Sequence, residues 1–326
     1  MISAKNYHYL YRLAKRTKPF FKKKNRFTET MHREKNAEAN GLISEYLKTG
    51  KPFLIGRLGS VESRFILNYY LSQNISSDFE GIYKTLAGQI NRFWKRENAL
   101  LEQLCLNAGF FPKDEKLTQR FVEVYENAIK QLDILGIWNE MEEFMEIPDE
   151  TVLCKIRELE PWFYENPWSN HLKGKKVLVV HPFESDIRNQ YNQRKNLYSN
   201  PNILPEFELK TIKAVQTIAG QKSEFETWFN ALDFMKEKIS QTDFDVAIIG
   251  AGAYGLPLAA YVKDLGKQAV HLGGVTQLLF GIKGKRWEDW THYTELRKEN
   301  GKYWVYPSDE NQPRDFKKIE GGAYWY

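Results

Sequence analysis

The chain has only two cysteines, Cys105 and Cys154, among its 326 residues, and their separation does not fit a metal-binding pair. All its apolar runs are shorter than the roughly 18 residues that a membrane-spanning helix needs. The N-terminal basic residues are not followed by the apolar stretch of a secretory signal. These absences predict a protein of a reducing compartment, the cytoplasm, in which both cysteines are buried packing residues.

Acidic residues are missing from the first part of the chain. Between Lys5 and Arg26 there are nine Lys or Arg, interleaved with aromatic residues, and no Asp or Glu. We therefore separate a basic N-terminal segment, residues 1–28, from the rest. Residues 5–26 could lie on an anionic membrane surface, on the inner face of the cell membrane, or form a solvated tail. Nucleic acid is not an expected partner, because basic residues concentrate in this segment and one loop.

The remaining residues have the composition of an ordinary globular protein, 42% hydrophobic and 27% charged over the whole chain. Short apolar runs alternate with amphipathic segments, which predicts a mostly parallel sheet with helices on both faces. The fold class is thus α/β and Rossmann-like, as one domain over 29–326. We expect a helical insertion or lobe at about 90–165 and an aromatic C-terminal tail, 287–326, that wraps over the sheet. The predicted strands are 51–57, 176–182, 207–214, 246–249 and 268–272.

A glycine-rich turn follows the fourth predicted strand, with Gly250, Gly252 and Gly255 in the spacing Gly-x-Gly-x-x-Gly. Such a turn before a helix presents backbone N–H groups to a phosphate, and we expect Ala253 and Tyr254 to take part. A tight turn that only lets helix and strand pack closely is the alternative. A dinucleotide-binding fingerprint fits poorly, because the turn comes late in the chain. The next strand also ends at His271 rather than at the carboxylate that would hold a ribose.

Polar and small residues also follow the other predicted strands, and ligands of parallel sheets bind at the carboxyl ends of strands. Arg57, Gly59, Ser60 and Glu62 follow the first strand. The planar guanidinium of Arg57 suits a phosphate. Glu62 could ligate a divalent cation or accept a proton from a sugar hydroxyl, although Arg57 and Glu62 could simply pair with each other.

Further candidates follow the second and fifth strands. His181, Glu184 and Asp186 come after the second, where either carboxylate could be a catalytic base or a helix cap. Gly273 and Gly274 come after the fifth, and a basic loop with Lys285 and Arg286 lies beyond them. That loop could supply counter-charges to a diphosphate or be merely solvated.

Two blocks of the chain resemble the GT-D fold glycosyltransferases of bacterial surface-glycan systems. The family motif Arg-x-Gly-Asp-x-Glu is similar to Arg57-Leu-Gly-Ser-Val-Glu62, with Ser60 in place of the Asp. The second block is 244–273. The resemblance implies a nucleotide-diphosphate sugar as donor, with Glu62 serving metal and donor. Because the Asp is replaced, it leaves open whether Mn²⁺ or Mg²⁺ takes part, or whether Arg57 and backbone dipoles stabilise the leaving diphosphate instead.

The leading hypothesis is a cytoplasmic, peripheral glycosyltransferase that moves a sugar to a surface-polysaccharide or glycan precursor, with Glu62 as first choice of base and Glu184 or Asp186 as second. A lipid-linked acceptor would suit the basic N-terminus. The alternatives are a non-catalytic nucleotide-sugar-binding component of a polysaccharide assembly system and an NAD(P)- or flavin-dependent oxidoreductase.

Overall fold

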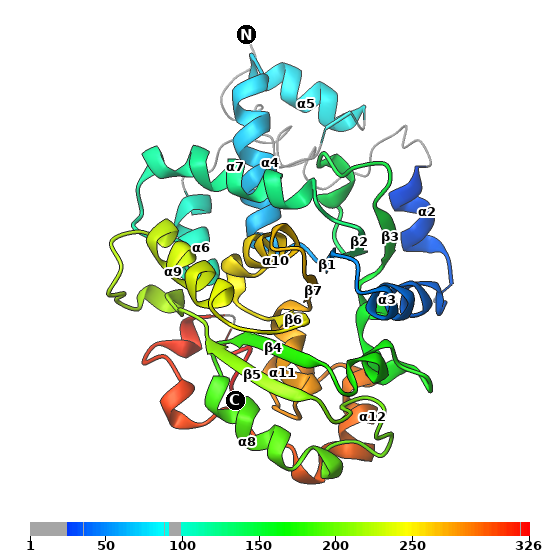
Figure 1. The fold of residues 1–326 in the computed structure, drawn as a ribbon. Coiled ribbons are helices and arrows are strands. Elements are labelled where there is room, and N and C mark those ends of the chain that lie inside the picture. The colour runs from blue at the N-terminus through cyan, green and yellow to red at the C-terminus, as the bar shows by residue number, and fades with distance from the viewer. Residues whose placement is uncertain (1–24, 35, 88, 91–98, 320) are drawn as a thin grey trace.

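A seven-stranded parallel sheet forms the centre of the molecule in the computed structural model, which describes residues 25–34, 36–87, 89–90, 99–319 and 321–326 (Figure 1). The strand order is β3-β2-β1-β7-β6-β4-β5, and every pairing is parallel. The strands are β1 (Phe53–Gly56), β2 (Ile134–Ile137), β3 (Val152–Lys155), β4 (Lys176–His181), β5 (Glu208–Lys213), β6 (Val246–Ile249) and β7 (Gln268–His271). The predicted α/β, Rossmann-like fold class is confirmed.

Helices cover both faces of this sheet, and Figure 1 shows them in two layers. One core cluster joins the sheet to α4 (Ser60–Asn74), α6 (Ala99–Ala108), α7 (Thr118–Ile129), α9 (Trp228–Ser240) and α10 (Gly255–Asp264). The cluster on the other face includes α3 (Glu38–Thr49), α8 (Glu184–Asn192), α11 (Thr276–Leu279) and α12 (Thr291–Asn300). Because both faces are covered, β1, β2, β6 and β7 are buried at every position, which explains the continuous apolar sequences of β1, β2 and β6. Helices α2 (Arg26–His32) and α5 (Asp78–Leu86) lie nearer the periphery.

The face of the sheet that carries a connecting helix depends on the direction in which the chain moves across the sheet. The chain moves from β5 to β6 and from β6 to β7 through α9 and α10 on the first face, and in the opposite direction, from β4 to β5, through α8 on the second. A single handedness of crossover requires this regularity. The connections after the neighbouring strands β4 and β6 therefore leave to opposite faces, which opens a crevice at their carboxyl ends.

The predicted helical insertion over 90–165 is wrong in part. Helices α6 and α7 lie there, but β2 and β3 lie there too and form one edge of the sheet. These strands are no shorter than β1, β6 and β7, but they lie among helix-like segments, where so short a run shows no period that separates it from a helix.

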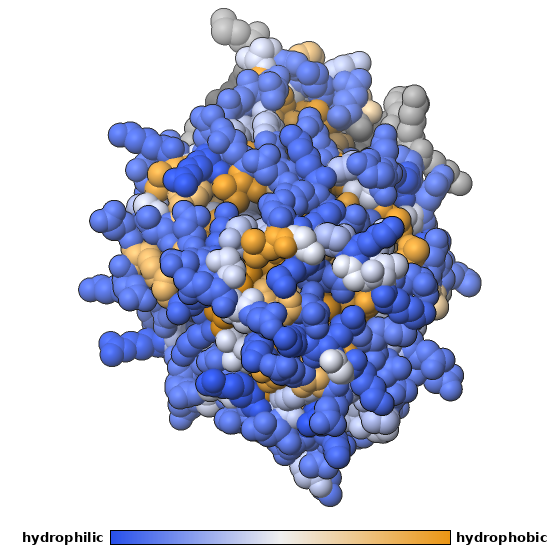
Figure 2. Space-filling model, viewed as in Figure 1, coloured by the Kyte–Doolittle hydropathy of each residue, from blue (hydrophilic) through white to orange (hydrophobic). Residues whose placement is uncertain are grey.

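The basic segment 5–26 lies almost entirely outside the described residues, so its proposed membrane contact is untested. Arg26 is described, and its guanidinium donates to backbone carbonyl oxygens at the start of β3: Ile147, Pro148, Asp149 and Thr151, at 2.8–3.2 Å. This arginine is therefore used by the fold. None of the helices within the described ranges combines the length and the apolar character that crossing a bilayer would take. The face seen in Figure 2 is mostly hydrophilic, with apolar residues in small groups.

The aromatic tail, 287–326, is part of the core rather than a loose cover. Trp325 is fully buried, its ring lies 5.9 Å from that of Phe183, and its indole Nε1 donates to the carbonyl oxygen of Asn311 at 3.0 Å. The tail therefore reaches the carboxyl ends of the strands, where it closes one side of a cavity.

Candidate functional site

A cavity of about 450 Å³ lies at the carboxyl edge of the sheet, over the crevice between β4 and β6. Residues that follow β1, β4, β6 and β7 share its wall with residues from the aromatic tail. The structure brings together ten of the residues predicted from the sequence: Arg57, Gly59, Ser60, Glu62, Gly250, Gly252, Tyr254, Gly273, Gly274 and Arg286. Arg57 and the glycine turn thus face the same space.

The glycine turn is shaped by close packing on one side and is open on the other. A Cβ atom on Gly250 would lie 2.7 Å from the carbonyl oxygen of Gly273 and 2.8 Å from Cδ2 of His181, so only glycine fits there. Gly252 has φ +52°, which glycine adopts without strain. The backbone N–H groups of Ala251 and Gly252 have no acceptor among the described residues. These donors on the cavity wall suit an anion.

Arg57 enters the cavity directly after β1. Its side chain runs beside Gly273, where a Cβ atom would lie 3.2 Å from Arg57 Cδ, and its guanidinium lies 5.1 Å from the centre of the Trp138 ring. No described carboxylate or acceptor pairs with this guanidinium. Burial lowers the pKa of Arg57, but an arginine remains charged at any physiological pH. The cavity therefore contains a cation whose donors are free for a ligand.

Trp138 is held firmly beneath that cation. Its indole Nε1 donates to the carbonyl oxygen of Leu58 at 2.8 Å. The carboxylate of Glu142, fully buried, accepts the backbone N–H groups of Trp138 and Asn139 at 2.8 and 3.1 Å. Burial raises the pKa of Glu142 to about 7, and these two N–H groups act against that rise. The segment after β2 thereby fixes the ring on which Arg57 rests.

Two more arginines line the cavity. Arg286 donates from Nη1 to the hydroxyl of Tyr324 at 2.8 Å, and its guanidinium lies 4.6 Å from the centre of the Tyr324 ring. Arg157 lies over the rings of Trp290 and Tyr293, at 5.8 and 6.0 Å. Arg286 is also close enough to Arg57 to lower its pKa. Cations held beside aromatic rings give the wall both positive charge and flat stacking surfaces.

The carboxylates on the wall are Glu62 and Glu160. Glu62, the third residue of α4 and 8% exposed, folds back over Gly59, since a Cβ atom there would lie 2.0 Å from Oε2. Glu160 is buried and accepts the hydroxyl of Tyr293 at 2.8 and 2.9 Å from its two oxygens. Burial first and this carboxylate second raise the pKa of Tyr293. With three guanidinium groups against two carboxylates, the wall has a net positive charge.

A divalent cation does not fit this wall well. Within the described ranges, no three His, Cys, Asp or Glu side chains gather in a way that could hold a metal ion. Ser60 and the folded-back Glu62 do not make the set of several oxygen ligands that Mg²⁺ or Mn²⁺ prefers. The positive charge on the wall therefore comes from the arginines, with the backbone N–H groups as further donors.

Two buried histidines also reach the wall, and both are neutral at pH 7. Burial lowers the pKa of His181 to about 3 and that of His271 to about 4, the latter with help from Arg57. The backbone N–H of Phe183 donates to Nδ1 of His181 at 3.0 Å, while Nδ1 of His271 donates to the carbonyl oxygen of Ile249 at 3.1 Å. Their backbone partners therefore fix both rings.

Glu184 and Asp186, expected as alternative bases, are not on the cavity wall. Glu184 accepts the hydroxyl of Thr211 and pairs with Arg188 at 3.3 Å. Asp186 accepts the backbone N–H of Ser308 and Nδ2 of Asn311, at 3.0 and 2.8 Å. Their acceptor positions are used to fasten α8 to β5 and to the C-terminal tail, which gives them a structural role.

Three predicted binding residues are likewise off the wall. The carbonyl oxygen of Ala253 accepts the hydroxyl of Tyr125 at 2.7 Å, and Gly255 packs against the ring of His271. Lys285 is exposed and donates to the carbonyl oxygen of Gly321 at 3.2 Å. The turn therefore faces the cavity through Gly250, Ala251, Gly252 and Tyr254, and the basic loop contributes through Arg286.

Sequence reading missed the wall residues Trp138, Arg157 and Glu160, which follow β2 and β3. Their signal was the pair of short apolar runs that precede them. Tyr293 and Tyr324 come from the tail, in which no pattern marks one aromatic residue above another.

Comparison of the chain with family models, with curated proteins and with solved structures gives no match. The site therefore has to be interpreted from its own geometry.

Proposed function

We propose that this protein is a glycosyltransferase that uses a nucleotide-diphosphate sugar as donor and a glycan or glycan precursor as acceptor. The observation that carries the proposal is the guanidinium of Arg57, which stands without a hydrogen-bonding or ionic partner among the described residues, in a cavity at the switch point of a parallel sheet. A half-buried charge without a partner is unfavourable, so the arrangement favours an anionic ligand.

The surroundings of Arg57 specify the anion further. Arg286 and the backbone N–H groups of Ala251 and Gly252 are donors on the same wall, as a diphosphate with several oxygens requires. The rings of Trp290 and Tyr293 offer flat surfaces for a base or a sugar. A nucleotide sugar has both kinds of group.

The proposed reaction needs a base and a stabilised leaving group. The acceptor hydroxyl oxygen attacks the anomeric carbon, and the bond from that carbon to the diphosphate oxygen breaks. The electron pair stays on the departing nucleotide diphosphate, whose charge Arg57 and Arg286 stabilise. The hydroxyl proton passes to Glu62, the wall carboxylate nearest Arg57 along the chain, once it has turned away from Gly59.

A non-catalytic nucleotide-sugar-binding protein is the second candidate, because Glu62 is folded back over Gly59. A thermal-shift screen of nucleotide diphosphates, nucleotide sugars and NAD, each with and without Mn²⁺, tests binding, since a ligand at 100 times its Kd stabilises by about 2.7 kcal/mol. We expect nucleotide diphosphates to raise Tm. Stabilisation by NAD alone would contradict the proposal. Release of free nucleotide diphosphate from a stabilising sugar nucleotide then separates a transferase from a binding protein.

A further inference from the structure

The side-chain amide of Gln277, in α11, has a nitrogen with hydrogen-bond partners and an oxygen without one among the described residues. The side chain is fully buried and lines the cavity. Its Nε2 donates to the carbonyl oxygens of Lys283 at 2.8 Å, Tyr324 at 3.2 Å and Ile282 at 3.3 Å. The orientation of the amide follows from these contacts, because a flipped group would place Oε1 against three carbonyl oxygens.

The other end, Oε1, has no hydrogen-bond partner among the described residues. Other buried side-chain atoms without a partner among the described residues belong to residues away from the cavity: Ser63, Trp162, Trp228 and Asn311. Among these residues, Gln277 is therefore the one that lines the cavity. An unpaired buried acceptor is unfavourable, and a ligand donor would relieve it.

We infer that Gln277 determines ligand specificity by accepting, at Oε1, a hydrogen bond from a neutral donor: a sugar hydroxyl, a ribose hydroxyl or a base N–H. This inference rests on the proposed function. Gln277 and Arg286 share Tyr324, since the carbonyl oxygen of that residue accepts from Gln277 and its hydroxyl accepts from Arg286. The neutral donor would therefore bind in the same cavity as the groups that hold the diphosphate, as the parts of a nucleotide sugar require.

The test compares ligands that differ by one donor. The probes are uridine diphosphate glucose, its 2-, 3-, 4- and 6-deoxy analogues, and analogues with a 2′-deoxyribose or an N3-methyl base, or the same set on whichever base binds best. We expect one analogue to bind wild-type protein about tenfold or more weakly than the parent, because a site built to accept a donor rejects a ligand without it. Equal binding of all analogues would overturn the inference.

Two variants separate the acceptor from the structural role of the amide. Gln277→Met and Gln277→Glu both remove the Nε2 donor and its three hydrogen bonds, but only Gln277→Glu keeps an acceptor in the cavity. We expect the ratio of Kd values between analogue and parent to fall to about 1 in Gln277→Met and to remain in Gln277→Glu. If the ratio is kept in both or lost in both, Oε1 is not the acceptor. If either variant does not fold, the ratio in the other variant and the wild-type series decide the question.

The two proposals fail differently. If no nucleotide diphosphate or sugar nucleotide binds the wild-type protein, the proposed function fails. If they bind but no analogue is discriminated, only the role of Gln277 fails.

Discussion

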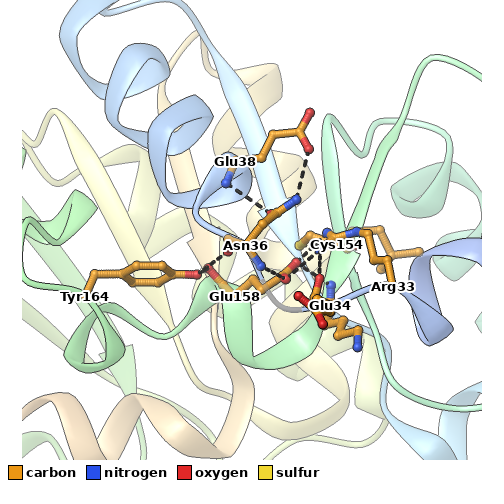
Figure 3. Close-up of polar contacts among 9 residues, drawn as sticks. Arg33, Glu34, Asn36, Glu38, Cys154, Glu158 and Tyr164 are labelled. Carbon is orange, nitrogen blue, oxygen red and sulfur yellow. Dashed lines mark hydrogen bonds and ion pairs between the residues drawn. The ribbon is translucent and has the colours of Figure 1, made fainter.

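Two arginines of this chain, Arg33 and Arg57, show how differently one residue type is used on the carboxyl side of the same half of the sheet. Arg33 donates from both Nη atoms to the two carboxylate oxygens of Glu158, at 2.7 and 2.6 Å (Figure 3). The backbone N–H groups of Asn36 and Lys155 donate to the same carboxylate at 2.9 Å each. Among the described residues, the guanidinium of Arg57 contacts only the face of the Trp138 ring.

The pKa shifts of these groups follow from that difference. Burial acts to raise the pKa of Glu158, yet Arg33 and the backbone donors hold it below its usual value, and Glu158 in turn raises the pKa of Arg33. The pKa of Arg57 is instead lowered by burial. The ion pair of Arg33 and Glu158 therefore joins the chain before α3 to the turn after β3. The guanidinium of Arg57, by contrast, keeps its donors for a ligand.

Breaking the Arg33–Glu158 ion pair should have the largest effect on stability. Arg33→Ala leaves the fully buried carboxylate of Glu158 without its countercharge, and we expect the free energy of unfolding to fall by about 3–5 kcal/mol. Nucleotide binding by the folded protein should not change. Urea denaturation followed by circular dichroism measures the change.

Arg188→Ala is the matched control for that change. Its partner Glu184 lies 3.3 Å away, but the Arg188 side chain is 57% exposed, so its loss should lower stability by less than about 1 kcal/mol. If Arg33→Ala and Arg188→Ala have the same denaturation midpoint, the Glu158 pair is not a structural fastening.

Substitution of Arg57 should instead weaken ligand binding without lowering stability. Arg57→Gln removes a charged donor from the cavity, and we expect nucleotide-diphosphate binding to weaken by about 10- to 100-fold, the equivalent of about 1.5–3 kcal/mol. The Tm of the ligand-free protein should not fall, because no described hydrogen bond is lost and an unfavourable unpaired charge is removed. Isothermal titration calorimetry and thermal melting measure the two quantities.

Arg120→Gln controls for the lost cation–π contact, since Arg120 lies 4.2 Å from the centre of the Phe229 ring and is not on the cavity wall. It should leave binding intact. A large loss of stability in Arg57→Gln, greater than in Arg120→Gln, would make Arg57 a structural residue like Arg33.

The same comparison explains what could be predicted from the sequence. Arg57 follows a strand whose apolar run is unbroken, and position after a strand was enough to place it at the carboxyl edge with the glycine turn. The partner of Arg33 could not be predicted, because Glu158 is 125 residues away and no local pattern joins the two. The place of a residue after a strand can therefore be predicted from the sequence, whereas a partner that tertiary packing brings from a distant segment cannot.

The missed wall residues have the same cause. β2 and β3 have four residues each, and the helical segments around them dominated the reading of 90–165. The residues after them, Trp138, Arg157 and Glu160, were lost with them. Glu184 and Asp186 were misjudged for a different reason: position after β4 is the same for a catalytic carboxylate and for one that fastens a helix. Only their partners, Thr211 and Asn311, tell the two apart.

A change of pH should have a smaller effect on stability, and that effect should come from His181 in the cavity wall rather than from the Arg33–Glu158 pair. His181 has a pKa of about 3 in the folded protein against an ordinary 6.5, so below pH 6.5 the unfolded chain binds a proton that the folded protein does not. Its contribution to stability is therefore complete above pH 6.5 and is lost as the pH falls, by about 2 kcal/mol between pH 7 and pH 5. Glu158, with a lowered pKa, stays ionised over that range.

His181→Asn should remove this part of the pH dependence, because the side-chain oxygen of Asn can accept the N–H of Phe183 without taking up a proton. We expect the unfolding free energy of His181→Asn to fall less steeply between pH 7 and pH 5 than that of the wild type, with His271 responsible for part of the remaining slope. Arg33→Ala should be less stable than the wild type across the same range, and the difference should shrink towards pH 5, because burial raises the pKa of a Glu158 carboxylate that has lost its countercharge. Urea denaturation at half-unit steps of pH measures all three slopes. If His181→Asn runs parallel to the wild type, the His181 ring is not kept neutral by burial in the cavity wall.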